Sequence, residues 1–384
     1  MGAPAFAIAL VISLTYAVTP IYRFEEPRPF TGASWYNPYD GLDGRSPDWR
    51  LSNFHAHSSA WAGLANGEQT PDSVVAAYQR LHYDVIGVSN YESNPEHRIA
   101  GTFPVYEHGW NVRKAHHLVF GPDRVVYGDF PFIQSRHQQQ YLLDELSRSA
   151  ALVAIAHPEV RDAQTPSDLR YLTHYELLEV LNRFTVPADS AWDAALSSGH
   201  AVWLLASDDS HNSADREQVG ANSTRIHSPS LGTSDIIDAL KAGHAYGLHG
   251  VSGHTNLALR TVQMLGDTLV VQVTGVPDTI RIVGQDGVVR AMAAGAQAAR
   301  GRLRAVATTA DGYLRVVAHG DSTMLYTNPV IRWNGRELPR VDVVVNWPKT
   351  IAWRGAWLLS YASLAMGFVS RRRRVRAARA ALVV

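Results

Sequence analysis

The chain contains no cysteine among its 384 residues. Disulfides, thiolate zinc sites and cysteine nucleophiles are therefore excluded, and His, Asp and Glu remain as the good metal ligands. An excess of charge of one sign is also lacking, because 35 basic residues balance 35 acidic residues and the formal net charge is zero. Nucleic-acid-binding proteins usually carry a basic excess or patch. We therefore expect no nucleic-acid partner.

Hydrophobic residues and histidine, in contrast, are plentiful. Hydrophobic residues make up 46% of the chain, which is typical of a folded protein with a real core. The length allows two or three domains of about 150 residues each. The 17 histidines point to metal chemistry, because imidazole is the commonest metal ligand in proteins and titrates near neutral pH.

Apolar segments lie near both ends of the chain. Residues 3–19 contain no charged side chain, and residues 351–370 contain only Arg354. Twenty helical residues cover about 30 Å, the thickness of the hydrocarbon core of a bilayer. The sequence therefore predicts a transmembrane helix at each end. A signal peptide is the alternative for residues 1–24, and a buried helix with a basic tail is the alternative for residues 347–384.

A basic cluster, Arg371–Arg374, directly follows the second apolar segment. Lys and Arg next to a transmembrane helix favour the cytoplasmic side. The C-terminus is therefore expected in the cytoplasm, and residues 25–346 on the opposite side of the membrane. The resulting location is the plasma membrane, with the catalytic domain extracytoplasmic or periplasmic.

Short β-rich runs alternate with amphipathic helical stretches between residues 46 and 254. The expected strands are residues 51–54, 84–88, 118–120, 152–156, 177–181 and 201–206. Repeated β-then-α units predict a parallel α/β architecture with ligands at the C-terminal ends of the strands. From about residue 256 to residue 333, strands separated by Gly and Asp turns predict a small β-sandwich. We therefore expect domains at 25–254 and 255–346.

Polar residues gather where the expected strands begin or end. His55 and His57 follow the first strand and are two residues apart, so both imidazoles can point to one side and reach one ion. The polar residues near other strand ends are Asn90, Tyr91, Glu92, Glu107, His116, His117, His157, Asp208, Asp209 and His211. The C-terminal ends of parallel strands converge on one mouth, which predicts that several of these side chains meet there.

These motifs resemble the polymerase and histidinol phosphatase (PHP) superfamily of metallohydrolases. The matching pieces, in the order of the family, are Asn53-Phe-His55-Ala-His57, residues 71–88, Glu107, His116, Ala156-His157-Pro158 and Ser207-Asp-Asp209-Ser-His211. The resemblance covers roughly residues 50–255. It implies a distorted (β/α)7 barrel whose mouth holds two or three divalent ions.

The resemblance also implies a ligand set. One ion would be bound by His55, His57, Glu107 and Asp209, and a second by Glu107, His116 and His157, with His211 left from a third site. His116 is preferred to His117 because its distance to Gly121 fits the family. The family normally has Asp-His where this chain has Asn90-Tyr91, and this departure predicts two ions instead of three. Zn, Mn and Fe all suit imidazole and carboxylate ligands.

A pair of divalent ions favours hydrolysis of phosphate esters, because it activates water and stabilises the oxygens of an in-line displacement at phosphorus. We expect a metal-dependent phosphoesterase acting on a phosphorylated small molecule or a lipid-linked substrate at the membrane. His211 or Tyr91 would donate the proton to the leaving oxygen, and Arg98 and Arg183 would contact phosphate. The alternatives are a metal-dependent ester or amide hydrolase and a non-catalytic, degenerate PHP binding module. No protein partner can be inferred.

Overall fold

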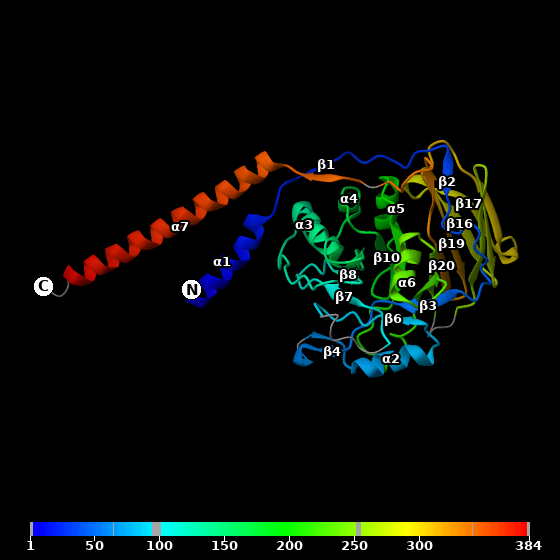
Figure 1. Ribbon diagram of the computed structural model, residues 1–384, viewed down its shortest axis with the longest axis horizontal. Coiled ribbons are helices and arrows are strands. Elements are labelled where there is room, and N and C mark those ends of the chain that lie inside the picture. Colours follow the sequence, from blue (N-terminus) through cyan, green and yellow to red (C-terminus); the bar gives the residue numbers. More distant parts are fainter. Residues whose placement is uncertain (1–2, 64, 94–100, 251–254, 340, 382–384) are drawn as a thin grey trace.

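The computed structural model describes residues 3–63, 65–93, 101–250, 255–339 and 341–381. A mixed α/β body carries two helices, α1 and α7, that project from one side (Figure 1). The helices are α1 (Ala3–Val18), α2 (Pro71–Arg80), α3 (Arg136–Ser147), α4 (Pro166–Leu169), α5 (Asp189–Ser197), α6 (Thr233–Lys241) and α7 (Trp347–Ala381).

A five-stranded sheet forms the centre of the body. Its strands are β7 (Val105–His108), β8 (His117–Phe120), β9 (Leu152–Ile155), β10 (Leu177–Asn182) and β11 (Trp203–Ser207), in the order β11-β10-β9-β8-β7. Strands β9, β10 and β11 are parallel, whereas β7, β8 and β9 pair antiparallel. Every residue of these strands is buried, which explains why most of them read as continuous apolar runs without alternation.

A ten-stranded sheet lies beside the first. Its strands are β2 (Ser34–Tyr36), β3 (Trp49–Asn53), β6 (Val85–Ile86), β12 (Asn222–His227), β13 (Ala245–His249), β16 (Thr279–Val283), β17 (Val289–Ala294), β19 (Tyr313–Gly320), β20 (Thr323–Thr327) and β21 (Val330–Trp333). Strands β3 and β6 are parallel, and the other pairs are antiparallel. The pairing of β13 with β20 joins strands from the first part of the chain to strands from the second.

The remaining strands form three smaller sheets. One has three strands, β14 (Ala258–Leu265), β15 (Thr268–Thr274) and β18 (Arg302–Val306). The other two are the pairs β1 (Tyr22–Phe24) with β22 (Val343–Val345) and β4 (Ser59–Ala60) with β5 (Ala65–Asn66). Buried side chains of β14 and β15 share one apolar cluster with those of β16 and β19, so the three-stranded sheet packs on the ten-stranded one.

The expected architecture, a (β/α)7 barrel followed by a small β-sandwich and flanked by transmembrane helices, is wrong. The chain forms a mixed α/β structure with strands in several sheets, many of them antiparallel. Buried parallel and buried antiparallel strands have similar apolar sequences, so periodicity alone does not fix the direction of pairing. The expected domain boundary at residue 254 lies among residues 251–254, outside the described residues.

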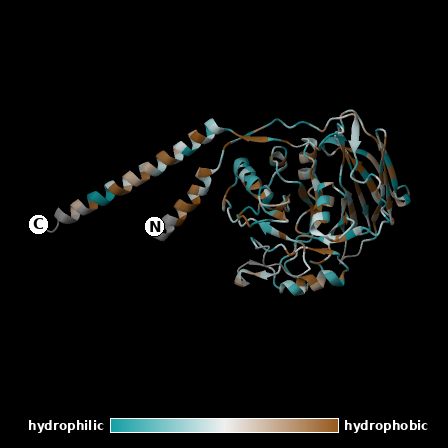
Figure 2. Cartoon of the chain, viewed as in Figure 1, coloured by the Kyte–Doolittle hydropathy of each residue, from teal (hydrophilic) through white to brown (hydrophobic). Residues whose placement is uncertain are grey.

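The two projecting helices also differ from the expectation. Helix α1 has 16 residues, fewer than the roughly 20 that a span requires. Helix α7 has 35 residues, but hydrophilic turns interrupt its hydrophobic ones (Figure 2). Of the helices in the described ranges, none combines the length and apolar character needed to cross a membrane. This finding contradicts the predicted transmembrane anchors and the plasma-membrane location inferred from them.

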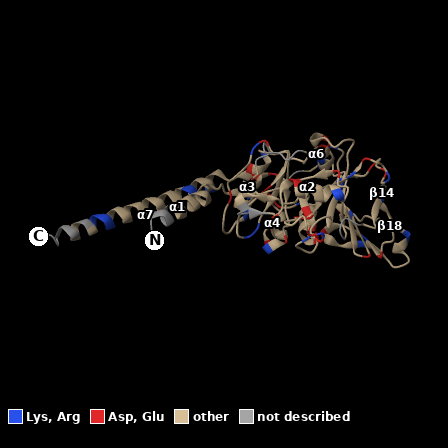
Figure 3. Cartoon of the chain, turned by 90° about the horizontal axis from the view of Figure 1, so that it is seen from below, with Lys and Arg blue, Asp and Glu red and all other residues tan. Residues whose placement is uncertain are grey.

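Helices α1 and α7 contact each other beside the body. The indole nitrogen of Trp353 donates to the carbonyl of Tyr16 at 3.3 Å, and the Tyr361 hydroxyl donates to Ser13 Oγ at 3.0 Å. Strands β1 and β22 pair where the two helices leave the body. In the view of Figure 3 the helices again lie together, and acidic and basic residues are intermixed along the chain of the body.

Helix α2 illustrates how local sequence signals build the wall around the site. Thr70 caps its first turn by accepting from the Ser73 amide, and Pro71 occupies the first helical position, where a missing N–H costs nothing. Val74 and Tyr78 lie on its buried face and pack in one cluster with residues of β3 and β6. The helix therefore supports the strand that leads into the two histidines described next.

Candidate metal centre

His55 and His57 follow strand β3, and both side chains are fully buried. The amide of His57 donates to the carbonyl of Ser210 at 2.7 Å, and the amide of Asp209 donates to the carbonyl of His55 at 2.8 Å. These two backbone bonds fasten the segment after β3 to the segment after β11. The His-x-His motif and Asp209 are therefore held next to each other.

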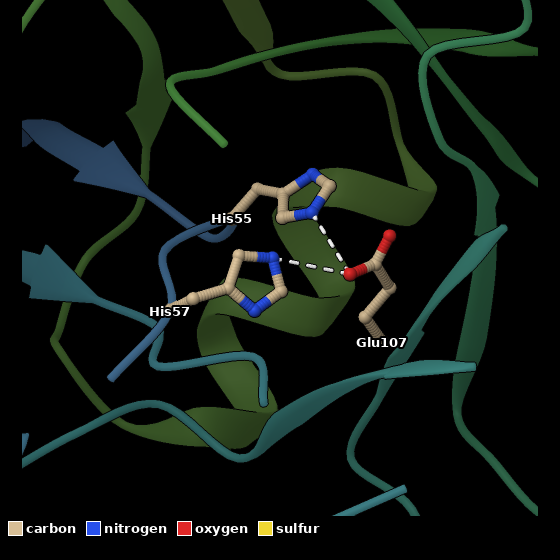
Figure 4. A group of neighbouring side chains, drawn as sticks. All are labelled: His55, His57 and Glu107. Carbon is tan, nitrogen blue, oxygen red and sulfur yellow. Dashed lines mark ion pairs between the residues drawn. The ribbon is translucent and has the colours of Figure 1, made fainter. Parts of the chain in front are cut away.

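Glu107 lies on β7 between two pairs of imidazoles. Its Oε2 atom is 3.1 Å from His57 Nε2 and 3.4 Å from His55 Nε2 (Figure 4). Its Oε1 atom is 2.5 Å from His116 Nδ1 and 3.3 Å from His157 Nε2. Each carboxylate oxygen thus faces a different pair of rings, which is the arrangement needed for one carboxylate to bridge two ions.

Asp209 supplies the second carboxylate of the cluster. Its Oδ1 atom is 3.1 Å from His55 Nε2 and 3.2 Å from His57 Nε2. Its Oδ2 atom is 3.9 Å from His157 Nε2. His211 is at the edge of the cluster, with its ring centroid 4.3 Å from that of His57 and its Nδ1 atom 3.7 Å from Asp209 Oδ1.

The side chains form four overlapping groups whose ligand atoms all lie within 4.8 Å of one another. The groups are His55, His57 and Glu107; His55, His157 and Asp209; His57, Asp209 and His211; and Glu107, His116 and His157. The structure therefore brings together all seven residues that the sequence nominated as metal ligands. Whether each binds an ion remains a prediction.

Unpaired polar atoms support a metal at the centre of the cluster. His55 Nε2, His116 Nδ1 and Glu107 Oε2 are buried, and none makes a hydrogen bond with the described part of the chain. Buried polar atoms nearly always have a partner. Converging imidazole nitrogens and carboxylate oxygens, several of them without a hydrogen bond, are a donor set that fits divalent Zn, Mn or Fe.

The electrostatics of the cluster also favour a bound cation. Burial by itself would raise the pKa of Glu107, but His116 and His55 hold that pKa well below its usual range. Burial would likewise lower the pKa of His55, but Asp209 and the neighbouring glutamates raise it well above its usual value. The carboxylates are thus ionised and require positive charge between them. The raised pKa values of His55 and His157 let these imidazoles supply it as protonated rings, and divalent ions would supply it more strongly.

Glu179 on β10 was missed in the sequence analysis. Its Oε1 atom is 3.1 Å from His55 Nδ1, and its Oε2 atom accepts from the His157 amide at 2.9 Å and from Asn182 Nδ2 at 3.0 Å. A carboxylate on one ring nitrogen directs the other nitrogen of a histidine toward the metal. The available signal was a single acidic residue in the otherwise apolar run of residues 177–181.

Asn90 and Tyr91, which replace the family's Asp-His pair, behave differently from each other. The Asn90 side chain bonds Ser58, accepting from its amide at 2.8 Å and donating to its Oγ at 2.7 Å, so its amide is engaged away from the cluster. The Tyr91 ring lies 5.2 Å from the His57 ring. Burial, with Glu107 and Asp209 nearby, raises the pKa of Tyr91, so its phenol stays protonated.

His116 and His117 point to opposite sides of β8. His116 contacts Glu107, whereas the His117 ring lies 5.9 Å from that of His108. Burial lowers the pKa of His117 well below its usual value, so this ring is neutral. Only His116 of the pair therefore faces the cluster.

The cluster opens into a cavity of about 540 Å³. The residues lining it are Tyr91, Lys114, His116, His157, Glu159, Val160, Arg161, Phe184, Thr185, Asp209 and His211. Lys114, Arg161 and Phe184 were missed because they sit in loops without a periodic pattern. Of the two arginines expected to contact phosphate, Arg98 lies outside the described residues, and Arg183 stacks at 4.6 Å on the Phe184 ring without lining the cavity.

Comparisons with known proteins add little. No family model matches the chain, and no curated protein does. One solved structure that resembles it is a two-domain protein containing a predicted PHP-like metal-dependent phosphoesterase from Bacteroides vulgatus ATCC 8482. That protein is 12% identical, and the match covers 81% of this chain and 92% of that chain with a TM-score of 0.39. A likeness at this level does not establish a common fold or function.

Proposed function

We propose that this chain is a metal-dependent hydrolase that cleaves phosphate esters with two divalent ions. The position of Glu107 carries the proposal, because one oxygen faces His55 and His57 while the other faces His116 and His157. Asp209 would complete the first site. His211 touches this set from the cavity side.

When bound, two divalent ions would supply a nucleophilic hydroxide at neutral pH and stabilise negative charge on the phosphoryl oxygens. Glu179 keeps His55 oriented, with Nε2 toward the cluster. Burial lowers the pKa of His211, and its Nδ1 lies 3.0 Å from the Asp209 carbonyl. This contact favours the proton on Nδ1, so Nε2 can accept a proton from the attacking water. Tyr91 keeps its proton and can donate a hydrogen bond to the leaving oxygen.

Two other functions use the same residues. An ester or amide hydrolase would need the same ligands, but the cationic Lys114 and Arg161 in the cavity wall favour an anionic substrate. A non-catalytic binding module would not require six fully or almost fully buried ligands to converge, and burying such polar side chains without a partner is unfavourable. A phosphorylated small molecule is therefore the proposed substrate.

The test combines metal analysis with a substrate screen. Protein loaded separately with Zn, Mn or Fe should contain two ions per chain and hydrolyse p-nitrophenyl phosphate or bis(p-nitrophenyl) phosphate. Glu107→Gln removes the charge that both sites share, so hydrolysis should fall at least about 100-fold, with loss of metal. The matched surface variant Arg300→Gln should change neither.

Other outcomes separate the alternatives. Cleavage of p-nitrophenyl acetate without cleavage of either phosphate ester would favour the carboxylester hydrolase. Two bound ions without hydrolysis of any of the three substrates would favour the binding module. One ion per chain in protein that is fully folded would remove the two-ion basis of the proposal.

A further inference from the structure

Two cationic side chains share the cavity with the metal cluster. Lys114 lies two residues before His116, and Arg161 lies four residues after His157. Each cation is thus carried by the same segment as one imidazole that faces Glu107 Oε1. The two side chains, named here the cation pair, therefore belong to one side of the cluster.

Reciprocal hydrogen bonds hold the two loops together. Arg161 Nη1 donates to the carbonyl of Val112 at 2.7 Å, and Arg113 Nη2 donates to the carbonyl of Asp162 at 2.8 Å. Lys114 and Arg161 both have left-handed backbones, with φ of 60° and 55°. Such conformations are unfavourable for side-chain-bearing residues and persist only where the surroundings impose them. The position of the cation pair is therefore built into the loops.

The charge of the cation pair is available to a ligand. The Arg161 side chain donates a hydrogen bond to the neutral carbonyl of Val112, and Lys114 Nζ lies 5.9 Å from the Tyr91 ring. Among the described residues, neither side chain forms an ion pair with a carboxylate within 4.0 Å. Glu159 is the acidic side chain outside the metal cluster that lines the cavity. The two cations outnumber it.

We infer that the cation pair binds the terminal oxygens of a phosphate monoester and makes monoesters the preferred substrates. This inference rests on the proposed phosphoesterase function. A monoester carries close to two negative charges at neutral pH and has three terminal oxygens. A diester carries one negative charge, and its second ester group would place a carbon-bearing oxygen beside the cation pair instead of a charged terminal oxygen. Arg and Lys both bind phosphate oxygens well.

The reaction assigned to this site is hydrolysis. The oxygen of water forms a bond to phosphorus, the bond from phosphorus to the ester oxygen breaks, and the proton that the water gives up passes to the leaving oxygen. The products are an alcohol and inorganic phosphate. The cation pair would contact the phosphoryl group throughout, since the terminal oxygens are present in substrate and product.

Binding of non-hydrolysable probes tests the inference apart from turnover. Phenylphosphonate mimics a monoester dianion, and methyl phenylphosphonate mimics a diester monoanion. Calorimetry on the metal-loaded full chain should show at least tenfold tighter binding of the dianion. In the double variant Lys114→Gln, Arg161→Gln, the affinity for the dianion should fall at least tenfold and the affinity for the monoanion less than threefold. The metal content should be unchanged. The exposed pair Lys349→Gln, Arg300→Gln is the matched control for charge and should match the unmodified chain.

The outcomes distinguish this inference from the proposed function. Equal weakening of both probes by the double variant, or no preference for the dianion, would overturn the inference. Preferential binding of the dianion through the cation pair without hydrolysis of any phosphate ester would support the subsite and overturn the proposed function. The double variant could fail to fold because it loses the hydrogen bond from Arg161 to the Val112 carbonyl. In that case Lys114→Gln alone should still bind the dianion at least threefold more weakly. Unchanged affinity of this single variant would overturn the inference.

Discussion

At the scale of single residues, we expect the proposed metal site to depend on the groups that touch the proposed ligands as much as on those ligands. Glu179 contacts His55 Nδ1 and also accepts from the His157 amide. It therefore positions two imidazoles that face Glu107 from different sides. A substitution of Glu179 therefore tests whether the orientation of His55 and His157 matters, and it removes none of the proposed ligands.

We predict that Glu179→Gln lowers metal affinity about 10- to 100-fold, the usual effect of losing a partner behind a ligand. An amide keeps the shape but loses the charge that fixes the His55 ring. Competition with a chromophoric chelator measures the affinity. Asp238→Asn, at an exposed position of α6, is the control. Unchanged metal affinity in Glu179→Gln would show that packing alone orients His55.

The adjacent histidines give a second prediction at this scale. His116→Ala should abolish one bound ion because His116 contacts Glu107, whereas His117→Leu should retain both ions because His117 faces His108. Leucine preserves much of the volume of the buried His117 ring and so limits the packing loss. Elemental analysis of both variants decides. Loss of metal in His117→Leu with retention in His116→Ala would reverse the assignment.

The clustering of the nominated side chains could be foreseen from the sequence, because several of them follow strands. His55, His57, His157 and Asp209 all lie within four residues of the end of a strand, β3, β9 or β11. The cation pair could not be foreseen, because Lys114 and Arg161 meet only through loop contacts between segments far apart in the chain. Side chains that such contacts bring together show no helix or strand periodicity in the sequence.

At the scale of elements, the buried cluster around Arg315 fastens helix α5 to strand β19. Arg315 is 2% exposed and forms two hydrogen bonds with Asp193, at 2.8 Å and 2.6 Å. Its Nη2 atom also lies 2.7 Å from Asp189 Oδ1. Because α5 follows β10, which carries Glu179, this cluster links the metal-site sheet to the ten-stranded sheet.

We predict that Arg315→Met lowers the free energy of unfolding by about 3–5 kcal/mol, the usual cost of leaving a buried carboxylate without its partner. Urea denaturation of the folded chain measures it. The double variant Arg315→Met, Asp193→Leu should recover a large part of the loss, because the unpaired charge is then absent. If the double variant recovers no stability, the loss in Arg315→Met comes from packing of Arg315 against Trp192 and not from the unpaired charge.

The positions of elements were predictable, whereas their pairing was not. The expected strands at 152–156 and 177–181 correspond to β9 (Leu152–Ile155) and β10 (Leu177–Asn182). The antiparallel pairing of β7, β8 and β9 was not expected. Strand direction is decided by contacts between distant segments, and the apolar runs that form the strands are compatible with either direction.

At the scale of the whole molecule, the prediction of transmembrane helices failed because it rested on the near-absence of charged residues in two segments and not on the length and hydropathy of the helices. Residues 351–370 look apolar by charge alone, but Arg354 and several Ser, Tyr and Trp residues dilute them. In the structure Arg354 donates to the carbonyl of Val18 at the end of α1. The two terminal segments thus bind each other, a contact that no segment-by-segment analysis reveals.

The stability of the whole molecule should depend on pH through the metal cluster. Burial tends to lower the pKa values of His55 and His157, but neighbouring carboxylates raise both above the ordinary 6.5. A raised imidazole pKa stabilises the metal-free fold below about pH 6.5, and this stabilisation is lost as the pH rises through the raised value. The lowered pKa values of Glu107 and Asp209 act oppositely, stabilising the fold above their ordinary 4.5 and 3.8 and losing effect in stronger acid.

The cluster therefore contributes most to the stability of the metal-free protein between about pH 4.5 and 6.5. As the pH rises through the raised pKa values of His55 and His157, the imidazole protons leave, and Glu107 and Asp209 lose the positive charge between them. Divalent ions replace those protons, so the rise in Tm on metal loading should grow steadily from pH 6 to pH 8.5. Calorimetric scans of EDTA-treated and metal-reloaded protein across this range measure the difference. Glu107→Gln, which lacks the shared charge, should show a much flatter profile. A rise in Tm that is constant or shrinks with pH would mean that metal ions and protons do not compete for these side chains, and that the ions bind elsewhere.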